Sequence, residues 1–311
     1  MSRVLVTGAT GFIGSALIGA FAAQGRALRA ASRRRPPHSF PAGVEVFAHG
    51  DFGDNVDWRQ ALDGVDGVIH LAGIAHAGSG IAANRYDRVN RLATERLAKE
   101  AARAGIGRFV FVSSLRAQSG PTADHVLTEN DAPMPSDAYG RSKFAAEEAV
   151  RVSGVPFTIL RPVVLYGPGV KGNVALLARV AASHWPLPLK NFANRRSLLG
   201  IDNFISAVAF VLSSPAAHGE TYIVADPGPA PSLSELIATL RKARGRAPML
   251  LPLPPSFIQM PLRVIGRSGL WERLGGTQQA SANKLIAAGW QPAHDTPSGL
   301  AAMVRAARPA Q

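Results

Sequence analysis

Cysteine is absent from this 311-residue chain. Its absence excludes disulfide bridges, thiolate metal sites, iron–sulfur clusters and a cysteine nucleophile. Histidine is sparse as well, because the chain has only eight and no two of them stand four residues apart. A helical His-x-x-x-His zinc pair is therefore missing, and the sequence predicts no metal site.

Long apolar runs free of proline are also missing. The N-terminus leads directly into an apolar strand and a glycine loop, without the apolar core of a signal peptide. The longest uncharged apolar stretch, Ala247–Leu262, contains five prolines, whereas a membrane-spanning helix needs about 20 apolar residues. We therefore expect a cytoplasmic protein with no integral membrane segment. With Arg263–Arg267, this stretch could lie on a membrane surface, but packing over a substrate cleft is the preferred interpretation.

Acidic residues are few relative to basic ones. Asp and Glu total 21 against 34 Lys and Arg, which gives a formal net charge of +13. This balance fits an anionic ligand or a nucleic acid, and it fits an Arg- and Ala-rich coding bias equally well. Because the first 44 residues hold six arginines and no acid, we expect an anion near this end. No nucleic-acid-binding motif occurs in the sequence, so no nucleic-acid partner is predicted.

Short apolar strands alternate with amphipathic helices in the first half of the chain. Hydrophobic residues form 47% of the sequence and charged residues 18%, as in a folded enzyme of one large or two coupled domains. Repeated strand–helix–strand units predict an α/β fold with a Rossmann-type, doubly wound parallel sheet and ligands at the carboxyl ends of its strands. The expected strands are Arg3–Thr7, Ala27–Ser32, Val44–His49, Gly67–Leu71, Arg108–Ser113 and Phe157–Arg161, and the expected helices are Phe12–Gln24, Val56–Leu62, Ala83–Arg103 and Ala138–Arg151.

The pattern loosens in the second half. Ser232, followed three residues later by Glu235, predicts a capping box at the start of a helix. We assign residues 1–165, completed by 195–225, to the nucleotide-binding domain, and 166–194 with 226–311 to a smaller C-terminal substrate-binding lobe. The remaining expected elements are helices at Asn173–Ser183 and Asp202–Ser213 and strands at Arg195–Ile201 and Tyr222–Ala225.

A glycine-rich loop follows the first strand. Its glycines let the backbone approach a pyrophosphate, and the helix that follows offers unpaired N–H groups to that anion. A plain tight turn is the alternative, but a position between strand and helix favours a dinucleotide site. The loop residues assigned to the coenzyme are Gly8, Thr10, Gly11, Phe12, Ile13 and Gly14.

The end of the second strand indicates which dinucleotide binds. An NAD site usually offers an acidic side chain about 20 residues after the loop, whereas this strand ends in Ser32, Arg33 and Arg34. These side chains suit a 2′-phosphate, so NADP(H) is favoured and NAD(H) remains possible. Asp51 and Phe52, which close the third strand, are candidates to hold the adenine.

A tyrosine and a lysine four residues apart carry the main catalytic signal. On a helix Tyr139 and Lys143 share a face, so the ammonium group can lower the pKa of the phenol. Tyr139 would then exchange a proton with a carbonyl or alcohol, while Ser114 hydrogen-bonds the same oxygen and a nicotinamide transfers hydride.

The order of these motifs resembles the extended short-chain dehydrogenases/reductases, the NAD-dependent epimerase/dehydratase family, over essentially the whole chain. The resemblance implies a Rossmann domain, a sugar-nucleotide lobe, the catalytic set Ser114, Tyr139 and Lys143, and a homodimer formed through the helices at 83–103 and 138–151. The motifs that carry it are Thr7–Gly14, His70–Gly73, Val89-Asn90, Ser113-Ser114, Tyr139-x-x-x-Lys143 and Arg161–Gly169. By the same resemblance, further coenzyme-lining residues are Leu71, Ala72, Gly73, Asn90, Pro162 and Val164.

The second half resembles the substrate side of this family. Asn173 matches an asparagine that meets the nucleoside diphosphate, and Arg196 matches an arginine on the diphosphate. The motifs most resemble bacterial UDP-4-keto-6-deoxy-N-acetylhexosamine 4-reductases. Dehydratases of the family carry Asp-Glu directly after the catalytic Thr/Ser, where this chain has Leu115-Arg116. We therefore expect reduction of the 4-keto group of a UDP-sugar; the alternatives are a UDP-sugar 4-epimerase and a non-catalytic NADP(H)-binding sensor or scaffold.

Overall fold

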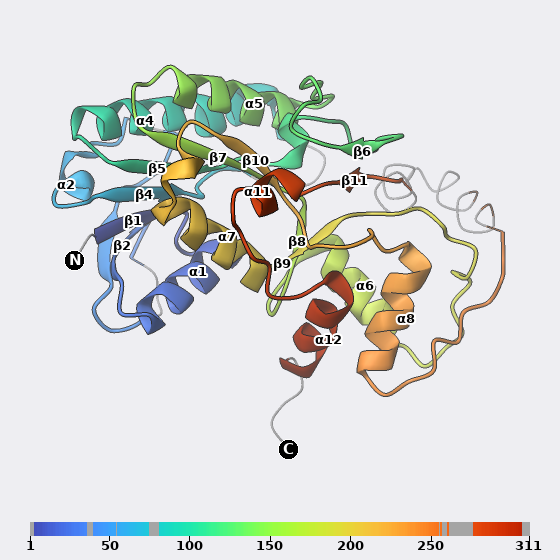
Figure 1. The fold of residues 1–311 in the computed structure, drawn as a ribbon. Coiled ribbons are helices and arrows are strands. Elements are labelled where there is room, and N and C mark those ends of the chain that lie inside the picture. The colour runs from blue at the N-terminus through green and yellow to red at the C-terminus, as the bar shows by residue number, and fades with distance from the viewer. Residues whose placement is uncertain are drawn as a thin grey trace.

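A seven-stranded parallel sheet forms the centre of the computed structural model (Figure 1). The structure describes residues 3–35, 40–53, 55–74, 81–254 and 276–306, together with Ser256 and Met260. The strand order β10-β7-β5-β4-β1-β2-β3 places β1 inside the sheet with later strands added on both sides, which confirms the predicted doubly wound α/β fold. The strands are β1 (Arg3–Thr7), β2 (Ala27–Ser32), β3 (Glu45–Ala48), β4 (Gly67–His70), β5 (Arg108–Val112), β7 (Phe157–Pro162) and β10 (Thr221–Val224).

Helices cover both faces of this sheet. All four residues of β4 are buried, as expected for a parallel strand packed on both sides. On one face α1 (Phe12–Ala23) and α7 (Ile201–Ser213) share a hydrophobic cluster, and Figure 1 shows them below the sheet. The opposite face is covered by α2 (Arg59–Leu62), α4 (Ala93–Arg103) and α5 (Ala138–Arg151).

One predicted helix contains an irregular turn. The chain is helical from residue 83 to 103 as expected, but α3 (Ala83–Tyr86) is followed by a π-helical segment, Asp87–Leu92, before α4 begins. Such wide turns occur frequently at functional sites. Here the wide turn carries Asn90, whose side chain is buried.

The C-terminal lobe packs around its own hydrophobic cluster. This cluster joins α6 (Gly172–Ala182), α8 (Leu233–Ala243) and α12 (Thr296–Ala306), which Figure 1 shows beside the main sheet. The predicted capping box is confirmed, because Glu235 N donates to Ser232 Oγ at 3.1 Å and Ser232 N donates to Glu235 Oε2 at 2.7 Å. The remaining elements are β6 (Val126–Leu127) paired with β11 (Gln279–Ala280), β8 (Val164–Tyr166) paired with β9 (Leu198–Gly200), α11 (Asn283–Ala287), and 3₁₀ turns at Leu115–Ala117 and Pro215–Ala217.

A partly buried carboxylate ties the β8–β9 sheet to α7. Asp226 accepts hydrogen bonds from the Tyr166 hydroxyl at 2.7 Å, Gly200 N at 2.8 Å and Asn203 Nδ2 at 2.7 Å. Thr296 Oγ1 adds a fourth bond at 2.9 Å from the start of α12. These contacts connect the lobe to the helix layer of the main sheet, and the four groups that donate to the Asp226 carboxylate come from four different elements.

Two predicted elements are shorter than expected by three or more residues. The strand expected at 195–201 covers only Leu198–Gly200, because Arg195 and Arg196 form isolated bridges with Ser232 and Gln278 and residue 201 already begins α7. The helix expected from residue 56 begins at 59, where the Asp57 carboxylate accepts from Arg59 N at 3.1 Å. Arg263–Arg267 and much of the proline-rich stretch lie outside the described residues. Among the residues described, no helix is long and apolar enough to cross a bilayer.

Candidate active site

The glycine loop between β1 and α1 leaves no room for side chains. Gly8 has a φ of +69°, and a Cβ there would lie 2.8 Å from Ala72 N. A Cβ on Gly14 would lie 2.3 Å from Gly8 O. Gly11 N donates to Gly8 O at 3.0 Å, and Gly11 begins α1 without any side-chain cap. The loop therefore leads into the N-terminus of α1, whose first backbone N–H groups can bind a pyrophosphate.

A histidine fixes the strand next to this loop. Thr7 Oγ1 and His70 Nδ1 are 2.6 Å apart, and His70 Nε2 lies 2.8 Å from Thr94 Oγ1. Burial holds the pKa of His70 well below its ordinary value, so the imidazole is neutral. Thr7 Oγ1 also accepts from Ala72 N at 3.2 Å, which places Leu71, Ala72 and Gly73 along the loop. Sequence reasoning missed this role of His70, although a polar residue that ends an apolar strand was a usable signal.

Asn90 closes the same region from the π-helical turn. Its Oδ1 accepts from Ile74 N at 2.7 Å, and its Nδ2 donates to Ile74 O at 3.1 Å and to Ser142 Oγ at 3.0 Å. A Cβ on Gly73 would lie 3.0 Å from Asn90 Oδ1. Asn90 thus joins the segment after β4 to the helix that carries Tyr139 and Lys143, and its assignment to the coenzyme remains a prediction.

The end of β2 carries two exposed arginines. Ser32 is buried and donates its hydroxyl to Arg34 O at 2.7 Å, so it shapes the turn, while the side chains of Arg33 and Arg34 face solvent. The Asp51 carboxylate accepts from Gly53 N at 2.9 Å. Phe52 is buried, with its ring 5.6 Å from that of Trp58 and 5.3 Å from that of His70. The Phe52 side chain therefore belongs to the core.

The structure brings Ser114, Tyr139 and Lys143 together. Ser114 follows β5, and its Oγ accepts from Arg116 N at 3.2 Å. Tyr139 lies in the first turn of α5, which Asp137 caps by accepting from Gly140 N at 2.7 Å. A Cβ on Gly140 would lie 2.3 Å from Arg116 O, so only glycine lets this helix approach the loop after Ser114 so closely.

The pKa of Tyr139, but not its position beside Ser114, differs from the prediction. Burial raises the pKa of the Tyr139 phenol, although a hydrogen bond with the Ser114 side chain opposes this. Lys143 is buried one turn later; its Nζ donates to Val112 O at 2.8 Å and lies 4.3 Å from the centre of the Phe111 ring. Desolvation lowers the pKa of Lys143 to about 7. The expected lowering of the Tyr139 pKa is thus wrong here because desolvation outweighs the Ser114 hydrogen bond and the charge of Arg116, and the phenol is held as a proton donor.

A buried ion pair that sequence reasoning missed supports the back of this site. Glu147, one turn beyond Lys143, accepts from Ser113 Oγ at 2.5 Å. Arg161 of β7 donates to both Glu147 oxygens, from Nε at 3.0 Å and from Nη2 at 2.6 Å, and to Gln118 Oε1 at 3.0 Å. Both charged side chains are almost fully buried. An acid four residues after the lysine and an arginine within an apolar strand were the available signals.

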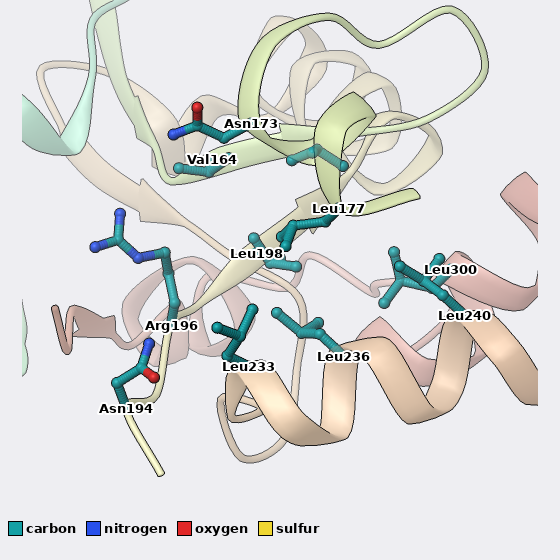
Figure 2. A pocket seen from close by; sticks show the side chains of 11 residues that line it. Val164, Asn173, Leu177, Asn194, Arg196, Leu198, Leu233, Leu236, Leu240 and Leu300 are labelled. Carbon is teal, nitrogen blue, oxygen red and sulfur yellow. The ribbon is translucent and has the colours of Figure 1, made fainter. Parts of the chain in front are cut away.

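Asn173 and Arg196 line one pocket in the C-terminal lobe, as Figure 2 shows. Arg196 Nη2 donates to Pro121 O at 3.2 Å and to Gly276 O at 3.1 Å, while its buried Nε has no hydrogen-bond partner among the described residues. Burial and the charge of Arg116 lower the pKa of Arg196. Val164, predicted to meet the coenzyme, also lines this pocket. Asn194 is a third polar residue of the lining, and the remaining residues are apolar: Val174, Leu177, Leu198, Leu233, Leu236, Leu240 and Leu300.

Arg116, which stands where dehydratases carry an acid, has a structural partner. Its Nη2 lies 2.5 Å from Asp137 Oδ2, so it links the loop after Ser114 to the cap of α5. The Asp137 carboxylate is thereby committed to a helix cap and an ion pair.

Comparisons with known proteins identify similar chains along almost the full length. The profile of the NAD dependent epimerase/dehydratase family matches residues 4–225. A UDP-glucose 4-epimerase from Vibrio cholerae is 30% identical, covering 93% of this chain and 90% of its own. A ceramide reductase from Caulobacter vibrioides is 30% identical, with 93% and 86% covered. The solved structure of MoeE5 in complex with UDP-glucose and NAD has a TM-score of 0.77 and 25% identity and covers 98% of both chains.

Proposed function

The chain is an enzyme of the NAD-dependent epimerase/dehydratase family, and we propose that it uses NADP(H) to reduce the 4-keto group of a UDP-sugar. The observation that carries the proposal is the meeting of Ser114, Tyr139 and Lys143 at the carboxyl ends of β4 and β5, where β1 contributes the glycine loop. The resemblance to UDP-sugar enzymes supports the substrate class, because the V. cholerae relative is a UDP-glucose 4-epimerase and MoeE5 was solved with UDP-glucose.

The glycine loop fits a dinucleotide. Only glycine at positions 8 and 14 allows the backbone to pack this closely around the turn, and the uncapped start of α1 supplies N–H donors for a pyrophosphate. A bound nicotinamide coenzyme supplies the hydride for the reaction. On the protein side, Asn90 holds the segment after β4 in place, and the exposed Arg33 and Arg34 are available to a 2′-phosphate.

Tyr139 and Ser114 divide the work at the sugar oxygen. The protonated phenol of Tyr139 donates its proton to the carbonyl oxygen at C4 as that oxygen gains negative charge, and the Ser114 hydroxyl orients the same oxygen. Lys143, held by Val112 O, stabilises the phenolate that remains and can return a proton to it, because its pKa lies near neutrality. Asn173 and Arg196 hold the diphosphate of the substrate at the neighbouring pocket.

Coenzyme preference gives the first prediction. We expect NADPH to bind more tightly than NADH, because β2 ends in two exposed arginines where an NAD site offers an acidic side chain. Replacing both arginines (Arg33→Ala, Arg34→Ala) should weaken NADPH roughly 10–100-fold, as expected for the loss of charge-assisted hydrogen bonds to a phosphate, and leave NADH nearly unchanged. Fluorescence titration of both coenzymes measures this. Arg59→Ala, at another exposed arginine, is the control, and NADH binding as tight as NADPH would refute the assignment.

The names of relatives favour a second candidate, a UDP-sugar 4-epimerase. An epimerase takes hydride from the sugar and returns it, so it regenerates its coenzyme in each cycle and gains from holding NAD tightly. A reductase must exchange its coenzyme after each turnover. The acid-free end of β2 favours an exchangeable NADPH and hence the reductase.

One assay separates the two candidates. With a 4-keto-6-deoxy UDP-sugar, the reductase should consume NADPH one for one, followed by the nicotinamide absorbance. The epimerase would instead interconvert UDP-hexose epimers with no net absorbance change, and would carry bound NAD through purification. The second result replaces the reductase with the epimerase. Mass spectrometry of ligands that copurify identifies the coenzyme independently of the choice of substrate.

A further inference from the structure

Four large apolar side chains are exposed together on the C-terminal lobe. They come from two segments, 183–190 and 248–254, which run side by side at the right-hand edge of Figure 1. Trp185 is 79% exposed, and its companions Met249, Leu251 and Leu253 are also exposed. We call these four residues the lobe patch. Exposed apolar side chains that occur singly are ordinary, but a contiguous group marks an interaction surface.

Backbone contacts hold the two segments of the lobe patch in a fixed relation. Leu187 N donates to Met249 O at 3.0 Å, Leu251 N donates to Leu187 O at 2.8 Å, and Lys190 N donates to Leu251 O at 3.1 Å. The patch is therefore presented on a bonded two-segment platform, built from residues more than sixty positions apart in the sequence.

The buried Arg241 side chain also joins the two segments of the lobe patch. Arg241 of α8 donates to Ser183 O at 3.1 Å and Trp185 O at 2.7 Å on one segment, and to Pro248 O at 2.7 Å on the other. It also donates to Met249 O at 3.3 Å. Met249 has a φ of +44°, a conformation that residues with side chains rarely adopt and that persists only where the surroundings fix it. The strained backbone of Met249 and the buried guanidinium of Arg241 therefore both support a pair of segments whose large apolar side chains are exposed.

The chain segments that form and flank the lobe patch are basic, and Glu235, at the start of α8, pairs with Arg195. Segments 167–201 and 236–254 contain nine Lys and Arg residues and no Asp or Glu. The exposed cations among them include Lys171, Arg179, Lys190 and Lys242. A surface that combines a tryptophan, long aliphatic side chains and an excess of cations matches the interfacial region of a bilayer that contains anionic lipids.

We propose that the lobe patch docks this enzyme on the surface of an anionic membrane. Trp185, Met249, Leu251 and Leu253 enter the headgroup region, and the surrounding lysines and arginines meet the anionic headgroups. A second copy of the chain is disfavoured as the partner, because two equally basic surfaces would repel each other. A nucleic acid would use the cations but would leave the leucines and the methionine exposed to water.

Vesicle sedimentation tests the proposal with the full-length enzyme. Binding is expected to vesicles of phosphatidylcholine mixed with phosphatidylglycerol, to be weaker on pure phosphatidylcholine, and to decrease with added salt. The double variant Trp185→Ser, Leu251→Ser should lower the partition coefficient about tenfold or more, since it removes two of the apolar side chains that would be buried. Lys190→Gln combined with Lys242→Gln should lower it by roughly tenfold on the mixed vesicles only.

Matched controls come from residues outside the two segments of the lobe patch. Val152, at the end of α5, is 80% exposed and Met134 is 77% exposed. Changing both to Ser should leave vesicle binding unchanged. None of these positions lies in the active site, so NADPH consumption in solution should be normal in every variant, and a failed reductase assay leaves the vesicle result intact.

Three outcomes would overturn the proposal. The first is unchanged vesicle binding in the Trp185→Ser, Leu251→Ser variant. The second is an equal loss in the Met134, Val152 control. The third is sedimentation of the wild-type protein, without vesicles, as a dimer that the lobe-patch variant abolishes, because the patch would then be a contact between copies of the chain.

Discussion

Replacing Tyr139 with phenylalanine is expected to lower turnover by about 10²–10⁴-fold while leaving coenzyme affinity unchanged. The substitution removes only the hydroxyl that lies beside Ser114, and burial keeps this phenol protonated at neutral pH. The ring remains in its place on α5, 6.1 Å from the Tyr86 ring, so the fold of the site should persist. Turnover is measured with NADPH and a 4-keto UDP-sugar, and coenzyme affinity by fluorescence titration.

A second tyrosine provides the matched control for this loss. Tyr222→Phe also deletes one hydroxyl, which donates to Ala216 O at 3.3 Å, away from the candidate active site. It should leave turnover within a small factor of the wild type. If Tyr139→Phe retains a near-normal rate on any accepted substrate, Tyr139 is not the general acid. If it loses coenzyme affinity and turnover together, its role is to shape the coenzyme site.

Local signals were enough to place most of the sheet. β1, β2 and α5 begin and end at the predicted residues, because their apolar runs are closed by glycine, polar strand ends or a helix cap close by in sequence. The capping box at Ser232 is likewise a local pattern, and it is present as predicted. The doubly wound topology followed from the repeated strand–helix–strand order alone.

Features that depend on contacts between distant residues could not be predicted from the sequence. The β6–β11 pair joins residues about 150 positions apart, and each strand has only two residues, too few for a periodic signal. The π-helical turn at Asp87–Leu92 looks like ordinary helix in sequence. The pKa of Tyr139 depends on how much water the folded site excludes, which residue spacing does not reveal.

The sequence predicted the main residues of the candidate site but not the buried ion pair behind them. The sequence indicated Ser114, Tyr139 and Lys143, which the structure brings together, and Asn173 with Arg196, which share one pocket. Their catalytic and binding roles remain predictions. The Glu147–Arg161 pair escaped notice because the partners lie on a helix and a strand, and only the fold shows that both are buried.

Breaking this pair should have the largest effect on stability. Glu147→Ala is expected to lower the free energy of unfolding by about 3–5 kcal/mol, because removing one partner leaves the other charge buried without compensation. Arg161 would retain only its bond to Gln118 Oε1, and the Ser113 hydroxyl would lose its acceptor. Because Ser113 lies between Val112, whose carbonyl anchors Lys143, and Ser114, some loss of activity should accompany the loss of stability. Urea denaturation of the coenzyme-free protein measures the change.

The adjacent residue shows whether burial is the cause. Glu148 carries the same side chain on the same helix, but it is exposed and pairs with the partly exposed Arg151 at the surface. Surface ion pairs contribute about 0–1 kcal/mol, so Glu148→Ala should unfold at nearly the wild-type urea concentration. Glu147→Gln keeps one acceptor oxygen but replaces the other with an amide NH2, and it removes the charge that pairs with Arg161 and lies 3.5 Å from Arg151 Nη2. Its loss beyond that of Glu148→Ala therefore measures the uncompensated guanidinium groups at the buried carboxylate. Equal midpoints for the Glu147 and Glu148 variants would show that the buried pair does not hold α5 against β7.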